Sequence, residues 1–98
     1  MMQIAESWLA ESAEGRELIA RFRVSMDASR VALDRAWHEA DLAALQKIAT
    51  HLKGTAASYG FPEVGAAAAE LERALRAGFD LDAPLDRLLA SIDRGAES

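Results

Sequence analysis

Apolar residues recur at helical spacing along most of the chain. From Arg16 to about Glu39 they are separated by three or four residues or by their sum, which places them on one side of an amphipathic helix. The members of this stripe are Ile19, Phe22, Met26, Leu33 and Trp37, widened by Leu18, Val31 and Ala36. A second stretch, from Leu42 to Tyr59, follows Asp41, whose carboxylate can accept from the first free backbone amides. The pattern therefore predicts two consecutive amphipathic helices.

Glycine and proline separate the later helices. The break at residues 60–62, Gly-Phe-Pro, is the clearest, because Gly tolerates the left-handed conformation that ends a helix and Pro suits the first turn of the next. We predict a third helix from Pro62 to about Ala77, ended by Gly78. A fourth helix opens at residues 82–84, Asp-Ala-Pro, and is expected to end before the polar segment 94–98.

The predicted links between these helices are only a few residues long. Short links make consecutive helices antiparallel neighbours. We therefore predict an all-α fold: an up-down antiparallel four-helix bundle in a single domain over residues 1–98, with its core at about 16–94. Ile4, Trp8 and Leu9 predict a short additional N-terminal helix that caps one end of the bundle.

Composition narrows the classes of function. With 98 residues, 51% of them apolar and 28% charged, the chain has the balance of a soluble globular protein. The absence of Cys excludes thiolate metal sites, and two His without an HExxH motif predict no metal or cofactor. A net charge of -5 repels phosphate backbones and argues against a nucleic-acid partner. The chain shows no secretory signal and no run of the roughly 20 apolar residues that span a membrane, so we expect a cytoplasmic protein. We also expect it to be a monomer.

The acidic residues are distributed unevenly. All 16 lie outside the segment 42–62, which contains Lys47, His51 and Lys53. At about 100° per residue, Thr50 lies opposite the apolar stripe of the second helix, with Gly54 one turn further on. The sequence therefore predicts a small basic outer face on an acidic protein, able to steer an acidic partner.

The stretch 48–61, IATHLKGTAASYGF, resembles the signature of histidine-containing phosphotransfer (HPt) domains. Further similarities, from about residue 16 to 94, are Phe22 in the first helix, Asp41 before the second, and Leu71-Glu72 in the third. The resemblance implies a four-helix bundle that relays a phosphoryl group between receiver-domain aspartates in two-component signalling. Its implied partners are a response-regulator receiver domain, a hybrid histidine kinase, or both. Such a domain is at most a phosphohistidine carrier without independent catalytic activity.

One position departs from the family pattern. The family's phosphoacceptor His stands three residues before the Lys and four before the Gly; here Thr50 holds that position and His51 follows it. A threonine phosphate ester is too stable to return its phosphoryl group readily to an aspartate. Three interpretations stay open: a domain that docks receivers without carrying phosphate, a domain in which His51 is the acceptor, and a variant form of an active HPt protein.

Docking is common to all three interpretations, and we predict it on the outer face of the second helix, with a receiver in a rotated pose if His51 is the acceptor. The residues predicted to act there are Lys47, Thr50, His51, Lys53, Gly54, Ala57 and Ser58. In this prediction Lys53 offsets phosphate charge, Gly54 admits the acidic pocket of the partner, and Lys47 can screen a phosphate on His51. The alternative is a helical interaction module that binds another acidic protein and takes no part in a phosphorelay.

Overall fold

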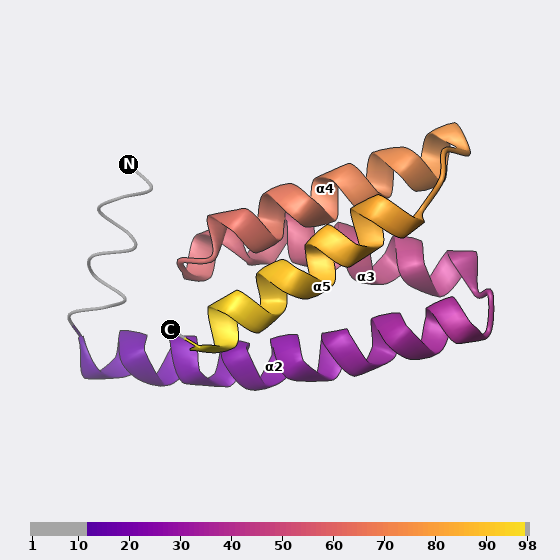
Figure 1. The fold of residues 1–98 in the computed structure, drawn as a ribbon. Helices are drawn as coiled ribbons and strands as arrows, with labels where there is room; N and C mark the ends of the chain where they lie inside the picture. Colours follow the sequence, from indigo (N-terminus) through magenta and orange to yellow (C-terminus); the bar gives the residue numbers. More distant parts are fainter. Residues whose placement is uncertain (1–11, 98) are drawn as a thin grey trace.

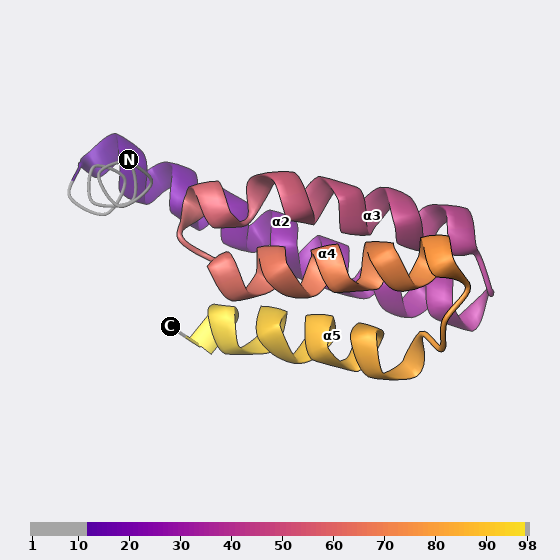
Figure 2. The same ribbon diagram turned by 90° about the horizontal axis from the view of Figure 1, so that it is seen from above.

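Residues 12–97, the part of the chain that the computed structural model describes, form an antiparallel bundle of four α-helices (Figure 1). The helices are α2 (Ala13–His38), α3 (Leu42–Thr55), α4 (Pro62–Ala77) and α5 (Asp82–Glu97), and the short 3₁₀ helix η1 (Ala57–Tyr59) follows α3. Helix α4 packs against α3 and α5, and α2 closes the bundle against the same two helices. The view in Figure 2 shows α3, α4 and α5 side by side with α2 behind them. The predicted up-down bundle is confirmed.

Three helix boundaries differ from the predicted ones. Helix α2 begins at Ala13 rather than Arg16, because the Ser12 side chain accepts from the backbone amide of Gly15 at 2.8 Å. Helix α3 ends at Thr55, and η1 completes the predicted length. Helix α5 continues to Glu97 instead of ending before the polar segment. The capping helix predicted from Ile4, Trp8 and Leu9 lies outside the described residues.

The core consists of apolar side chains contributed by all four helices. Its fully buried large members are Met26, Leu33, Leu45, Leu52, Val64, Leu71, Leu88 and Ile92. The prediction that Val31 widens the stripe of the first helix is wrong, since its side chain is 68% exposed. Val31 is about 200° around the helix from the fully buried Leu33, which turns it toward solvent. None of the helices within residues 12–97 combines the length and the apolar character needed to cross a membrane.

Residues in the left-handed conformation stand at each turn of the chain. Gly60 (φ 88°) and Gly78 (φ 74°) end η1 and α4, as the sequence predicts. Ala40 (φ 55°) has this role after α2, and the next amide, of Asp41, donates to the carbonyl of Ala36 at 2.8 Å. The Asp41 carboxylate then accepts from the amide of Ala44 at 3.1 Å. The predicted N-cap of α3 is therefore present.

An aromatic cluster fixes the end of α3 against α2. The rings of Phe22 and Tyr59 stack with centroids 4.7 Å apart, and the Phe61 ring lies 5.7 Å from Phe22. A Cβ atom on Gly95 would lie 3.1 Å from Cδ1 of Phe61, so α5 approaches this cluster closely only because residue 95 has no side chain. This packing places the last part of α5 against the aromatic cluster that follows α3.

Candidate functional site

The residues predicted to form the docking face lie along α3 and η1. Lys47, Thr50, His51, Lys53, Gly54 and Ser58 are exposed, and Ala57 is half-buried. The core-facing side of the same helix carries Leu45, Ala49 and Leu52, each at most 1% exposed. The amphipathic pattern therefore oriented α3 correctly. Thr50 and Lys53 lie at the edge of the exposed face that borders α4.

A buried carboxylate from α4 joins Thr50 and Lys53. Glu72 is only 3% exposed, and both of its oxygens are hydrogen-bonded. The Thr50 hydroxyl donates to Oε2 at 2.5 Å, and the Lys53 ammonium donates to Oε1 at 2.7 Å. Arg76, one turn further along α4, places Nη2 at 3.8 Å from Oε2. These four side chains are called the Glu72 cluster below.

The Glu72 cluster holds its carboxylate in the ionised form. The hydrogen bond from Lys53, followed by the one from Thr50, lowers the pKa of Glu72 from its ordinary value of 4.5, although burial acts in the opposite direction. The ionised Glu72 can only accept hydrogen bonds, so the Thr50 proton is committed to it. One carboxylate and two cations leave the Glu72 cluster with one net positive charge.

Sequence reasoning missed Glu72 as a part of this site. The segment 42–62 contains no acidic residue, yet α4 brings a carboxylate against Lys53, so Lys53 is not the unpaired cation that the charge pattern indicated. One signal was available: Glu72 is four residues after Ala68 and three before Leu75, on the apolar side of its helix. A Glu on such a face is buried, and a buried carboxylate requires partners.

His51 faces a different neighbour from Thr50. Its side chain borders a shallow depression between α2 and α3, whose other lining residues are Leu18, Arg21, Phe22, Thr55 and Tyr59. The backbone carbonyl of His51 accepts from the Thr55 hydroxyl at 2.8 Å. Consecutive residues on a helix are about 100° apart, so Thr50 lies toward α4 and His51 toward α2. The structure therefore does not bring His51 together with Lys53.

Gly54 leaves open space beside Thr50. A Cβ atom at position 54 would have no described neighbour within 4 Å, whereas one on Gly65 would lie 3.5 Å from the backbone nitrogen of Ala57. Packing among residues 12–97 therefore does not require glycine at position 54. Gly65 has a packing reason instead, because α4 crosses η1 and the end of α3 there.

The sequence model of the Hpt domain matches residues 17–95. The chain belongs to the Hpt domain family. Searches of curated proteins and of solved structures gave no match. Membership confirms the resemblance described above and connects this Hpt domain with two-component phosphorelay, in which such domains work with receiver domains and histidine kinases.

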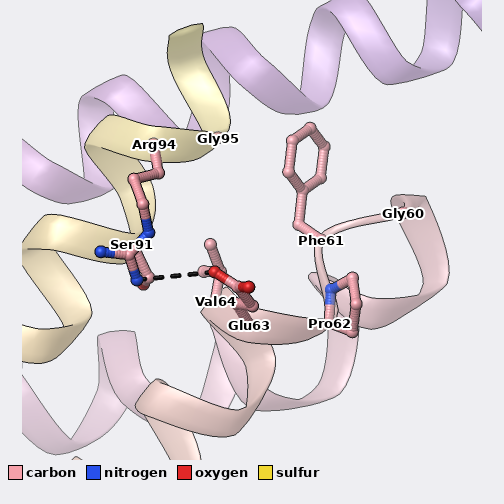
Figure 3. A pocket seen from close by; sticks show the side chains of 8 residues that line it. All are labelled: Gly60, Phe61, Pro62, Glu63, Val64, Ser91, Arg94 and Gly95. Atoms are coloured by element: carbon pink, nitrogen blue, oxygen red, sulfur yellow. Dashed lines mark ion pairs between the residues drawn. The ribbon is translucent and has the colours of Figure 1, made fainter. Parts of the chain in front are cut away.

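A pocket on another side of this Hpt domain lies between the start of α4 and the end of α5 (Figure 3). It has a volume of about 290 Å³ and is lined by residues 60–64 together with Ser91, Arg94 and Gly95. Across it, Arg94 Nη2 lies 3.5 Å from Glu63 Oε2, drawn as the dashed line in Figure 3. This ion pair joins α4 to α5, whereas the family's acceptor position lies on α3. We therefore place the candidate site at the Glu72 cluster and the outer face of α3.

Among residues 12–97 of this Hpt domain, no group of three or more His, Cys, Asp or Glu side chains is arranged to hold a metal ion. The hydroxyl, ammonium and carboxylate of the Glu72 cluster are bound to one another instead. What the site offers a partner is therefore its hydrogen-bonding capacity, its charge and its shape.

Proposed function

We propose that this Hpt domain docks receiver domains through the outer face of α3 and does not accept a phosphoryl group at position 50. The observation that carries the proposal is the hydrogen bond from the Thr50 hydroxyl to Glu72 at 2.5 Å. At the family's acceptor position there is an alcohol bound to a carboxylate, where a phosphorelay needs an imidazole.

The surroundings of Thr50 also oppose a phosphate ester on it. Phosphorylation would replace the donated proton by a group with a charge of about -2 directly beside the ionised Glu72. Repulsion between the two anions would then act at a contact now made at hydrogen-bond distance. Charge and ester stability therefore both argue that Thr50 is not a substitute acceptor.

Several features support docking in spite of the missing acceptor. The outer face of α3 is exposed, has open space at Gly54, and carries Lys47 and the net positive Glu72 cluster. The Asp41 cap and the aromatic cluster around Tyr59 hold both ends of α3, so the face is preorganised for an acidic partner. In this proposal the domain is a cytoplasmic monomer, and its partners are receiver domains and hybrid histidine kinases.

His51 provides the second candidate function. It is exposed, and Arg21 lines the same depression, so a phosphoryl group on His51 would have a guanidinium nearby. A receiver would then have to dock over the boundary between α2 and α3 instead of over α3 and α4. In that case the domain is a phosphohistidine carrier with a displaced acceptor.

Phosphotransfer with radiolabelled partners tests both candidates. The domain is incubated with a phosphorylated receiver and, separately, with an autophosphorylated hybrid kinase, and acid-labile, base-stable label on the domain is measured. Binding to the same receivers is measured by biolayer interferometry. We expect binding without label in the natural sequence, and label after Thr50→His, since the introduced imidazole would lie beside Glu72.

The variants separate the outcomes. Label on the unaltered sequence that disappears in His51→Ala would establish His51 as the acceptor, and the second candidate would then replace a domain that docks without carrying phosphate. Label after Thr50→His that persists in the double variant with His51→Ala would support it. If neither form binds a receiver domain or a hybrid kinase, the docking proposal is wrong, and an interaction module with another acidic partner becomes the explanation.

A further inference from the structure

We propose that Thr50 positions a water molecule that hydrolyses the aspartyl phosphate of a receiver docked on α3, so that the domain removes phosphate from the receiver instead of carrying it. This inference rests on the docking proposed above and adds a reaction to it. Its chemical substrate is the mixed anhydride between an aspartate carboxylate and phosphate, and its second reactant is water.

The hydrogen-bonding state of Thr50 leaves it ready to accept from water. A hydroxyl has one proton to donate and two lone pairs that accept. The proton of Thr50 is donated inward to Glu72 Oε2 at 2.5 Å, and the residue itself is exposed. The lone pairs therefore face the surface on which a partner docks. Since an ionised carboxylate can only accept, Glu72 maintains this orientation at neutral pH.

A water molecule bound to Thr50 would lie where the family's nucleophile stands. The Thr hydroxyl oxygen is two bonds from Cα, whereas the outer ring nitrogen Nε2 of a His is four bonds away. A water that donates to Thr50 lies about 2.8 Å beyond the hydroxyl oxygen, which makes up most of this difference. A receiver docked in the family's manner would thus present its phosphorus atom to a water oxygen instead of to an imidazole nitrogen.

The charges and the open space around Thr50 favour hydrolysis of the aspartyl phosphate there. Glu72 is 3% exposed and lies behind Thr50, so its negative charge is set back from an incoming phosphoryl group. Lys53 Nζ and Arg76 Nη2 lie 2.7 and 3.8 Å from the carboxylate oxygens, and together they outweigh its charge. The open space at Gly54 leaves room for the receiver's aspartate one turn away.

The step balances with water as the second reactant. The water oxygen forms a bond to phosphorus as the bond from phosphorus to the aspartyl oxygen breaks, and the electron pair of that bond remains on the carboxylate. One water proton passes to solvent, and the products are inorganic phosphate and the free aspartate. The carboxylate is a good leaving group, so Thr50 has only to orient the water. Ionised Glu72, with its lowered pKa, is a weak base and keeps Thr50 in position.

Phosphate release from a receiver tests the inference. Receiver domains from the genome that encodes this chain are phosphorylated with ³²P-acetyl phosphate, freed of excess reagent and mixed with an excess of the domain. Inorganic phosphate and protein-bound label are then followed over time, and binding is measured in parallel. We expect the half-life of the aspartyl phosphate to fall by roughly tenfold or more, with label released as inorganic phosphate.

Two variants of Thr50 make the test specific. Thr50→Ser keeps the hydroxyl and should keep most of the acceleration, whereas Thr50→Val keeps the shape without the oxygen and should bind the receiver but lose the acceleration. A thermal melt verifies that the Val variant is folded; if it is not, Thr50→Ala takes its place.

The remaining outcomes overturn the inference in distinguishable ways. Binding without faster phosphate release contradicts it and leaves the docking proposal intact. Acceleration that survives in Thr50→Val contradicts the role of Thr50. Transfer of label to the domain indicates an acceptor rather than hydrolysis. Absence of binding to every receiver overturns the docking proposal, and the inference with it.

Discussion

Thr50, Lys53 and Glu72 form a site whose parts depend on one another. The hydrogen bonds at 2.5 and 2.7 Å satisfy a buried carboxylate whose other charged neighbour, Arg76, lies further away at 3.8 Å. In return, the carboxylate fixes the orientation of the Thr50 hydroxyl and neutralises Lys53. A substitution at any of the three residues therefore changes the charge or the geometry of the other two.

Glu72→Gln should make the stability of the domain less sensitive to acid. The pKa of Glu72 is lowered from 4.5, chiefly by Lys53 and then by Thr50, so the unfolded chain binds more protons than the folded one between the lowered pKa and about pH 4.5. Its stabilising contribution is fully present above that window and is lost as the pH falls through it. Urea unfolding at a series of pH values measures this. Equal pH dependence of the two proteins would contradict the assignment.

Gly54→Ala should raise the stability of the domain while weakening its binding to a receiver. The added methyl group meets no described atom within 4 Å, and replacing a helical Gly by Ala raises the free energy of unfolding by roughly 0.5 to 1 kcal/mol. If a receiver approaches this point closely, the same methyl group weakens binding. Chemical denaturation and biolayer interferometry measure the two effects.

Gly65→Ala is the matched control for the change at position 54. Gly65 is buried, and its Cβ would make an ordinary contact at 3.5 Å with the backbone of Ala57 in η1, so the added methyl group would lie beneath the docking face and not on its surface. Receiver binding should therefore be unaffected by it. Unchanged binding in Gly54→Ala would show that the partner does not use the open space.

The boundaries of the helices depend on single turn residues with left-handed backbones. Ala40 (φ 55°) and Gly78 (φ 74°) have the same role after α2 and α4, but one has a Cβ atom and the other has none. The left-handed region disfavours a residue with Cβ by about 1 kcal/mol or more. The chain therefore accepts strain at Ala40 that it avoids at Gly78.

Exchanging these residue types should have opposite effects. Ala40→Gly relieves the strain and is expected to raise the free energy of unfolding by up to about 1 kcal/mol, while Gly78→Ala should lower it by a similar amount. Urea denaturation of the two single variants and of the double variant measures both. A loss of stability in Ala40→Gly would show that the entropy of the unfolded chain outweighs the strain.

Local chemistry made most of the elements predictable. Pro62, Gly78 and the Asp41 cap act on their immediate neighbours, so the bounds of α4 and the start of α3 follow from the sequence. The end of α5 was predicted wrongly: the helix continues to Glu97, and there Gly95 lies against Phe61, which is distant in the chain and so is not visible in a local pattern. The approach of Glu72 to Thr50 depends in the same way on how α3 and α4 are aligned, which no local pattern encodes.

Across the whole molecule, the net charge of -5 opposes an acidic receiver while α3 attracts it. Lys47→Ala should therefore slow receiver association by roughly threefold at low ionic strength, and the difference should shrink as salt screens the charges. Stopped-flow mixing at several salt concentrations measures this rate.

Arg87→Ala is the matched control for Lys47→Ala. It removes the same charge from α5, which packs against α2 and α4, and the Arg87 side chain lies 3.6 Å from Glu70. We expect it to have a much smaller effect on the association rate. Equal effects of the two variants would mean that net charge, rather than the face of α3, governs the encounter.

The pairing of Lys53 with Glu72 has a consequence for how such domains change over evolutionary time. Loss of Lys53 would leave a buried carboxylate without its closest cation, which a folded protein tolerates poorly. Selection for stability alone therefore retains the Lys of the Lys-Gly pair after the neighbouring acceptor has been replaced. A genome survey that identifies phosphate carriers by the Lys-Gly pair alone will also count domains that have no acceptor. A survey that also reads the residue three positions before the Lys will distinguish domains with an acceptor His from domains without one.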